Sequence, residues 1–172
     1  MRKHAAMTFI VLAAALALAA ASAFGHGNEH GKTQAVIGGA NVSIDYGRPT
    51  LKGRDLNALI KPGQLWRIGA DVPTTIESDT DLDFGGTRVP KGKHILLARM
   101  IAPGQWSLVV SSQPVARFAP DAKLAEEAMT VEQRSDSAEE LTIGLTNNGG
   151  NGGTIEISWG TQRLIAPFKP AS

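Results

Sequence analysis

Residues 41–49 read Asn-Val-Ser-Ile-Asp-Tyr-Gly-Arg-Pro, and this stretch decides the fold class of the chain. Apolar or aromatic side chains stand at every second position from Val42 to Tyr46, and polar side chains fill the positions between them. Because successive side chains of a β-strand point to opposite faces, this period of two predicts a strand with one buried face. Pro49 has no backbone N–H to continue a ladder, so the strand is expected to end just before it.

The same alternation recurs at short intervals along the rest of the chain. Further strands are expected over residues 74–78, 81–84, 87–89, 93–100, 105–111, 129–134, 141–145, 155–159 and 162–168. Gly85-Gly86 and Pro103-Gly104 predict tight hairpins between neighbouring strands. The alanine- and glutamate-rich stretch 119–128 favours a helical turn instead. The chain is therefore predicted to be all-β, an antiparallel β-sandwich or a jelly-roll-like domain.

The N-terminal end of the chain has the composition of a cleaved leader. Arg2 and Lys3 precede an uncharged apolar run over residues 7–20, which is short for a bilayer span. Ala21-Ser22-Ala23 then gives the small residues that a signal peptidase prefers, so cleavage is expected before Phe24. The alternative is an uncleaved anchor, which the lack of a basic cluster after the run disfavours.

These boundaries divide the chain into three parts. Residues 1–23 are predicted to be a signal peptide, residues 24–34 a flexible Gly/His-rich segment, and residues 35–172 a single β-sandwich domain. The processed chain is expected to have no transmembrane segment and to be exported, either to a periplasm or to the extracellular medium.

Composition excludes several classes of function. The chain has no cysteine, which rules out disulfides, thiolate metal sites and cysteine nucleophiles. Its formal net charge is +1 and no basic stripe is visible, so nucleic acid is not an expected partner. Neither a Gly-x-Ser-x-Gly elbow nor a His-Glu-x-x-His pair occurs, so hydrolysis has no motif to support it. A binding role is therefore favoured over an enzymatic one, and no cofactor is expected.

Several short blocks of sequence resemble a known family. They are Tyr46-Gly47-Arg48-Pro49, Lys52-Gly53-Arg54, Leu65-Trp66-Arg67-Ile68-Gly69-Ala70, Thr74-Thr75-Ile76, Val89-Pro90-Lys91-Gly92-Lys93 and Trp106-Ser107-Leu108. Together they resemble a bacterial family catalogued as domain of unknown function 2911, over residues 35–112. The sequence departs from the family habit at Asp71-Val72-Pro73, where Asn-Glu-Ala is usual, and at His94, where tyrosine is usual. The resemblance implies an exported β-rich domain and carries no established activity.

Candidate ligand-binding side chains gather in and near these blocks. They are Tyr46, Arg48, Arg54, Trp66, Arg67, Asp71 and His94. Arginine forks bind carboxylate, phosphate or sulfate through paired hydrogen bonds, and Trp66 and Tyr46 would give flat walls for a sugar or an aromatic ring. In the alternative interpretation Arg67 and Asp71 form an internal ion pair and Trp66 fills the core. His94 is a lone histidine beside an apolar strand, and a histidine in that position is more often a packing residue than a base.

A metal site is a separate hypothesis for the processed N-terminus. Cleavage before Phe24 would leave a free amine two residues before His26. The amine, two backbone amides and the imidazole together supply the square-planar nitrogen ligands that copper(II) and nickel(II) prefer, and His30 could add another. Cleavage before His26 would destroy this arrangement.

The sequence thus predicts an exported β-sandwich module of unknown biochemical function that binds a small anionic or carbohydrate ligand. The alternatives are an enzyme that acts on an envelope glycan or other envelope component, and a purely structural envelope protein. The oligomeric state is left open.

Overall fold

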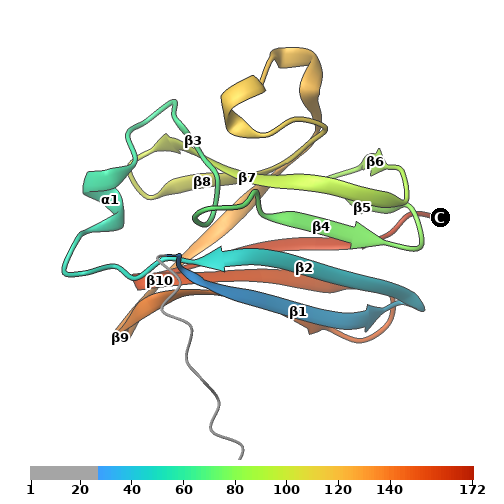
Figure 1. Ribbon diagram of the computed structural model, residues 1–172. Helices are drawn as coiled ribbons and strands as arrows, with labels where there is room; N and C mark the ends of the chain where they lie inside the picture. Colours follow the sequence, from blue (N-terminus) through green and yellow to red (C-terminus); the bar gives the residue numbers. More distant parts are fainter. Residues whose placement is uncertain (1–26) are drawn as a thin grey trace, which may run out of the picture.

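The computed structural model describes residues 27–172, whose strands join into one antiparallel sheet (Figure 1). The strands are β1 (Glu29–Ile37), β2 (Ala40–Arg48), β3 (Leu65–Trp66), β4 (Thr75–Ser78), β5 (Leu82–Phe84), β6 (Thr87–Val89), β7 (Gly92–Ala102), β8 (Gln105–Ser111), β9 (Lys123–Asn147) and β10 (Gly153–Pro170). Within the described residues the other elements are a short helix, α1 (Leu56–Leu59), and two 3₁₀ turns, Val115–Arg117 and Pro120–Ala122. The expected leader, its cleavage site before Phe24, and His26 lie outside this range.

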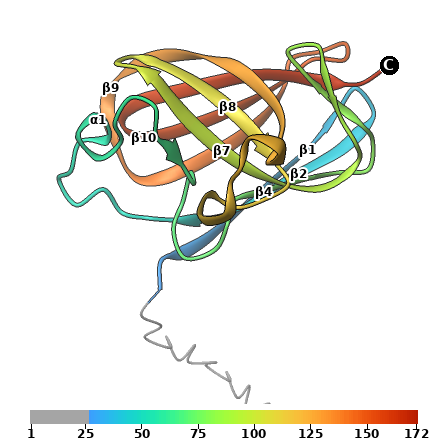
Figure 2. The same cartoon turned by 90° about the horizontal axis from the view of Figure 1, so that it is seen from above.

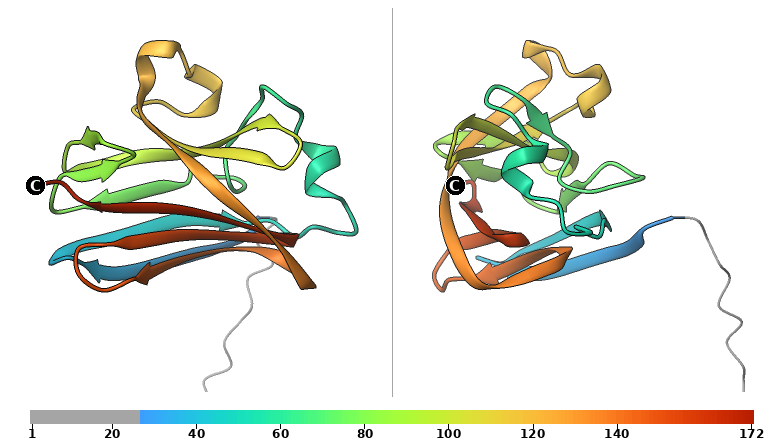
Figure 3. Two further views of the ribbon diagram at one scale, coloured as in Figure 1. Left: turned by 180° about the vertical axis from the view of Figure 1, so that it is seen from behind. Right: turned by 90° about the vertical axis from the view of Figure 1, so that its left-hand side faces the viewer.

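The sheet runs in the order β1-β2-β4-β7-β8-β9-β10-β5-β6, with β3 added on β7. Its longest strand belongs to two layers. The first part of β9, as far as Met129, pairs with β8, and the part from Thr130 onward pairs with β10. Figure 3 shows β9 crossing from one layer to the other. From above, the strands surround one common interior (Figure 2), so the predicted all-β antiparallel fold is confirmed as one sheet folded over on itself.

The alternation that predicted the strands also builds the core. Val42, Ile44 and Tyr46 of β2 are at most 4% exposed. All three tryptophans of the chain meet in the same core: Trp66 stacks on Trp159 with ring centroids 5.7 Å apart, and meets the edge of Trp106 at 6.1 Å. Full burial of one large apolar side chain is worth about 1.5–3 kcal/mol, so these rings contribute much of the stability. Trp66 therefore fills the core, as the alternative interpretation held.

The helical turn expected over residues 119–128 is wrong beyond its first residues. A 3₁₀ turn occupies Pro120–Ala122, and Lys123 already begins β9. From there on the strand pairs with β8, which places Ala125 opposite Val110 and Met129 opposite Trp106. Hydrogen bonding to a neighbouring strand and burial of every other side chain outweigh the helix propensity of alanine and glutamate.

Two other boundaries differ from the sequence expectation. β1 begins at Glu29, so the second half of the segment that was expected to be flexible, residues 24–34, is paired with β2. The strands expected at 155–159 and 162–168 are parts of one strand, β10, which is interrupted by register shifts near Gly160. Among residues 27–172, no helix has the length and apolar character that crossing a membrane requires.

Candidate functional site

Tyr46 lies where the β1–β2 hairpin meets β9. Its ring covers Gly31, where an added Cβ would lie 2.5 Å from Tyr46 Cζ. The Tyr46 hydroxyl accepts a hydrogen bond from the backbone N of Ile143 at 3.0 Å and donates one to the carbonyl O of Ile143 at 3.4 Å. A buried strand edge needs partners for its backbone N–H and C=O groups, and the Tyr46 hydroxyl is the partner of both groups of Ile143.

Arg48 lies two residues after Tyr46 on β2 and also contacts β9. Its Nε donates to the carbonyl O of Leu141 at 3.4 Å, while its terminal nitrogens lie 2.8 Å from Glu140 and 3.4 Å from Glu29. We call the set Tyr46, Arg48, Leu141 and Ile143 the seam. Every polar group of Tyr46 and Arg48 that points into the seam has a partner, so both residues hold the fold together.

Two of the blocks that carry the family resemblance meet beside the seam. The backbone of Gly47 lies so close to Ala70 that an added Cβ would collide with the Ala70 carbonyl oxygen. The loop that holds Ala70 is also strained, because Ile68 has φ 48° and Asp71 has φ 64°. A β-branched residue in this region is an outlier that costs about 1–3 kcal/mol, and such strain concentrates at functional sites.

Arg67 and Asp71, on this strained loop, do not form the ion pair that the sequence suggested. Arg67 Nε donates to the carbonyl O of Gly69 at 3.1 Å, and Asp71 Oδ2 accepts from the backbone N and Nδ2 of Asn28 at 2.8 and 3.1 Å. Within residues 27–172, no hydrogen bond or salt bridge joins the Arg67 and Asp71 side chains. The Asn28 backbone and side-chain hydrogen bonds lower the pKa of Asp71 below its usual 3.8, and the charge of Arg67 adds to the effect.

The two histidines in the described residues form no hydrogen bond with Arg48, Arg54 or Arg67. His94 is half-buried near the start of β7, with Nε2 2.7 Å from the carbonyl O of Pro90. His30 is exposed on β1, opposite Gly47. No group of three or more potential metal-ligating side chains comes together within residues 27–172. The N-terminal copper hypothesis involves His26 and stays a prediction.

Arg54 lines a pocket of about 280 Å³ between the loop that carries α1 and the bend in β10. Figure 2 shows α1 beside this end of β9 and β10. The pocket is lined, among others, by Arg54, Asp55, Glu139, Trp159, Gly160 and Gln162. We call it the Trp159 pocket. It combines an arginine with a tryptophan, as the sequence predicted, but the tryptophan is a different one.

A bulge in β10 builds this pocket. The register with β9 shifts on both sides of Gly160, whose φ is 63°. Before the bulge, odd-numbered residues are buried, and after it even-numbered ones are: Ile155, Ile157 and Trp159, then Gln162, Leu164, Ala166 and Phe168. The bulge therefore turns both Trp159 and Gln162 inward, in the way that bulges re-aim side chains next to functional sites.

Two of the side chains that line the Trp159 pocket each have one buried polar atom without a partner among the described residues. Gln162 is 4% exposed and its Nε2 donates to Asn57 Oδ1 at 2.8 Å, but its Oε1 accepts nothing. Trp159, 5% exposed, has an unpaired Nε1–H. Exchanging the amide oxygen and nitrogen of Gln162 would not help, because it would place its oxygen against Asn57 Oδ1, another acceptor, and leave its nitrogen unpaired. Since each buried unpaired group costs about 1–3 kcal/mol, one such donor and one such acceptor on two side chains that line the same pocket require an explanation.

The charged side chains of the pocket are partly engaged by the backbone. Arg54 donates through Nε and Nη2 to the carbonyl oxygens of Leu51 and Thr50, both at 2.9 Å. Asp55 accepts from the backbone N of Asn57 at 3.0 Å, and Glu139 from that of Lys52 at 2.8 Å. One cation and two anions thus line the pocket. This mixture favours a neutral ligand with several donors and acceptors over a simple anion.

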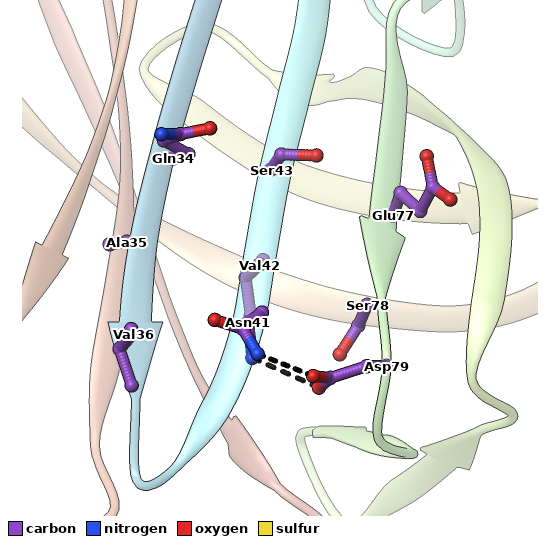
Figure 4. A pocket seen from close by; sticks show the side chains of 9 residues that line it. All are labelled: Gln34, Ala35, Val36, Asn41, Val42, Ser43, Glu77, Ser78 and Asp79. Carbon is purple, nitrogen blue, oxygen red and sulfur yellow. Dashed lines mark hydrogen bonds between the residues drawn. The ribbon is translucent and has the colours of Figure 1, made fainter.

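A larger hollow lies elsewhere, over the outer face of β1, β2 and β4, and measures about 510 Å³ (Figure 4). Asn41 donates to Asp79 through its backbone N at 2.9 Å and through Nδ2 at 2.6 Å. Gln34 and Glu77 are exposed and open to water. Because its polar groups are either bonded to each other or solvated, nothing in this hollow requires a ligand.

The seven predicted ligand residues are thus dispersed. Tyr46 and Arg48 serve the seam, Trp66 fills the core and His94 bonds a turn, whereas Arg54 lines the Trp159 pocket. Arg67 and Asp71 come together at a second pocket. Gln162 and Trp159 were missed, although a polar residue in phase with Leu164 and Ala166 could have been noticed in the sequence.

The fold and the site define a class: an all-β antiparallel domain with a small polar pocket at a strand bulge. The model of one family, described as Protein of unknown function (DUF2911), matches residues 28–168. The chain belongs to this family, which confirms the resemblance seen in its sequence blocks. No curated protein and no solved structure matches the chain significantly.

Proposed function

We propose that this protein is an exported binding module whose Trp159 pocket takes a small, uncharged polyhydroxy ligand such as a single sugar unit. The observation that carries the proposal is that two side chains lining one pocket each have a buried atom without a partner: an acceptor, Gln162 Oε1, and a donor, Trp159 Nε1. A sugar hydroxyl both donates and accepts, so adjacent hydroxyls can satisfy both atoms.

The size of the pocket sets the size of the ligand. A cavity of about 150 Å³ holds benzene, and drug-sized pockets begin near 300 Å³, so about 280 Å³ suits one monosaccharide ring. One face of Trp159 is already stacked on Trp66, so that face is not available to a ligand. The proposed recognition therefore rests on hydrogen bonds.

A binding role is favoured over catalysis on a glycan. Glycoside hydrolysis uses two carboxyl groups, and the pocket does contain Asp55 and Glu139. Asp55 accepts a hydrogen bond from the backbone N of Asn57, and Glu139 of β9 accepts one from the backbone N of Lys52, which gives each carboxylate a structural task. Release of reducing sugar from envelope polysaccharide by the purified protein would favour the enzymatic alternative.

The test is a titration of the described domain with glucose and N-acetylglucosamine, with glucuronate and sulfate as anionic probes, followed by ¹H–¹⁵N NMR. The indole N–H signal of Trp159 should move with a neutral sugar and move less with the anions. The indole signal of Trp106, whose Nε1 is also buried and unpaired but lies outside the pocket, is the internal control.

A pair of variants makes the test specific. Gln162→Met should abolish the response, whereas Gln105→Met, at an exposed position on β8, should leave it unchanged. Binding of the anions alone would replace the sugar by an anionic ligand. No movement of the Trp159 signal at tens of millimolar sugar would refute the proposal.

Export is supported by the basic start, the apolar run and the small residues before Phe24. Mass spectrometry of the protein recovered outside the cytoplasm should give an N-terminus at Phe24. A full-length mass would contradict both export by cleavage and the copper hypothesis, because His26 would not be the third residue.

A further inference from the structure

A second pocket, of about 220 Å³, lies on the outer face of β7 and shares no lining residue with the Trp159 pocket. Its floor is formed by Ile95 and Leu97, and its roof by Pro114, Val115 and Ala116. Figure 1 shows the covering segment with its 3₁₀ turns standing over β7 and β8. We call it the Arg67 pocket, because Arg67 is one of the two charged residues, with Asp71, that line it.

The inner surface of the Arg67 pocket is apolar because two apolar side chains of β7, Ile95 and Leu97, line it. Leu96 and Ala98 of β7 point into the main core, so Leu97 points to the opposite face, and yet Leu97 is only 1% exposed. The segment 114–116 lines the same pocket as Leu97. An apolar floor under a roof of small apolar residues takes an apolar group and excludes a sugar.

The lining also presents one charge of each sign. Within residues 27–172 the terminal nitrogens of Arg67 make no hydrogen bond, since only its Nε is used, by Gly69. Asp71 uses Oδ2 for Asn28 and leaves Oδ1 free. The strained loop between them is fixed from both sides, by Asn28 at Asp71 and by the Thr74 hydroxyl, which donates to the carbonyl O of Ile68 at 2.6 Å. The loop backbone that carries the two charged side chains is therefore held in place before any ligand arrives.

We infer that the Arg67 pocket binds a free α-amino acid with an apolar side chain. The side chain occupies the space over Leu97, the carboxylate meets the Arg67 guanidinium, and the ammonium group meets Asp71 Oδ1. The volume is somewhat larger than the about 150 Å³ that holds benzene, so leucine and phenylalanine side chains fit. This inference is independent of the sugar proposal, since it uses other residues and another chemistry.

A ligand with only one charge fits the pocket less well. A simple carboxylic acid would bring its charge next to Asp71, and a simple amine would bring its charge next to Arg67. Like charges placed together discriminate against the wrong ligand as strongly as good contacts select the right one. An amino acid pairs both groups at once.

The experiment compares three ligands on the same domain: L-phenylalanine, 3-phenylpropionate, which has no ammonium group, and phenethylamine, which has no carboxylate. Calorimetry and NMR should show saturable binding of phenylalanine, with shifts at the Val115 and Ala116 amides. Each truncated ligand should bind about tenfold more weakly, since each loses a charge-assisted contact. Equal binding of phenylpropionate, or no saturable binding of phenylalanine, overturns the inference.

Variants locate the effect in the pocket. Ala116→Phe fills the pocket and should abolish binding, whereas Ala119→Phe, exposed in the same segment but outside the pocket, should not. Asp71→Asn keeps a residue that tolerates positive φ, so the loop is retained, and it should remove the preference for phenylalanine over phenylpropionate. Unchanged selectivity in a folded Asp71→Asn protein, or full binding by Ala116→Phe, contradicts the assignment. Dispersed NMR spectra of each variant confirm its folding.

Discussion

The seam and the Trp159 pocket present the same problem and answer it in opposite ways. In both, a polar group lies inside the protein next to the β9–β10 hairpin. At the seam the hydroxyl of Tyr46 meets both backbone groups of Ile143, and Arg48 meets Leu141, so nothing remains unpaired. In the pocket Gln162 Oε1 and Trp159 Nε1 remain unpaired.

The difference separates residues that stabilise the fold from residues that are available to a ligand. A buried polar atom with an internal partner contributes to stability, whereas an unpaired one lowers stability until something binds it. Tyr46 and Arg48 stand out in the sequence and are structural. Gln162 does not stand out, and it marks the candidate site.

Gly47→Ala, which adds one methyl group beside the seam, is expected to have the largest effect on stability. The new Cβ would collide with the backbone carbonyl of Ala70, which cannot rotate away as a side chain could. We expect Gly47→Ala to lower the free energy of unfolding by at least about 3 kcal/mol, at the upper end of overpacking effects, as measured by urea denaturation.

Gly144→Ala is the matched control, because its new Cβ would have Glu156 Cβ as its nearest neighbour, at 4.0 Å. It should change stability by less than about 0.5 kcal/mol. Equal stability of the two variants would mean that the loop and β2 do not approach as closely as described.

Tyr46→Phe should have the next largest effect. It leaves the ring over Gly31 and removes the oxygen that pairs with Ile143, so both backbone groups of Ile143 lose their partner. The expected loss is about 1–3 kcal/mol, with faster hydrogen exchange at the Ile143 amide. Thr142→Val, which removes an exposed hydroxyl on the neighbouring residue, should leave that exchange rate nearly unchanged.

At the pocket, Gln162→Met should change stability by less than about 1 kcal/mol. The variant removes one hydrogen bond, to Asn57, but also removes the unpaired Oε1, and these effects oppose each other. Urea denaturation of Gln162→Met and Tyr46→Phe, measured side by side, compares their losses in free energy of unfolding. If Gln162→Met costs as much as Tyr46→Phe, then Gln162 is a structural residue and the contrast between the two regions fails.

The smallest effect on stability is expected for Asp71, whose hydrogen bonds with Asn28 are exposed to solvent. The Asn28 hydrogen bonds lower the pKa of Asp71, so its carboxylate stabilises the folded state above its unfolded pKa near 3.8, and this stabilisation disappears as the pH falls through the lower folded value. The stability advantage of the natural chain over Asp71→Asn should therefore be present at neutral pH and vanish well below pH 3.8. Thermal unfolding at both pH values measures it, and an advantage that grows on acidification would exclude the assigned partner.

Period-two patterns gave most of the fold. β2, the β5–β6 hairpin and the β7–β8 hairpin all follow from alternation and from glycine or proline at the turns. The pattern failed at residues 119–128, because local propensity carries no information about β8, the partner that makes this segment a strand.

The candidate site was harder to predict because it depends on contacts between distant residues. The arginines and aromatics were recognised by type, yet type does not reveal which of them find partners inside the protein. The bulge at Gly160 was partly readable, since the buried phase changes between Trp159 and Leu164. That Gln162 lacks a second partner could be seen only once α1 and β10 were placed side by side.

The crossing of β9 between layers has a consequence for the order of assembly. Tyr46 reaches a partner 97 positions away in the sequence, and contacts of such long range close slowly because the intervening chain must first lose its freedom. Among the described strands, β1 is an end strand that pairs only with β2, so until β9 packs beside the hairpin the outer edge of β1 is open to pairing with other chains. We therefore expect that refolding is slow and sensitive to protein concentration, and that substitutions in the second half of β9 retard it more than substitutions in the first hairpin.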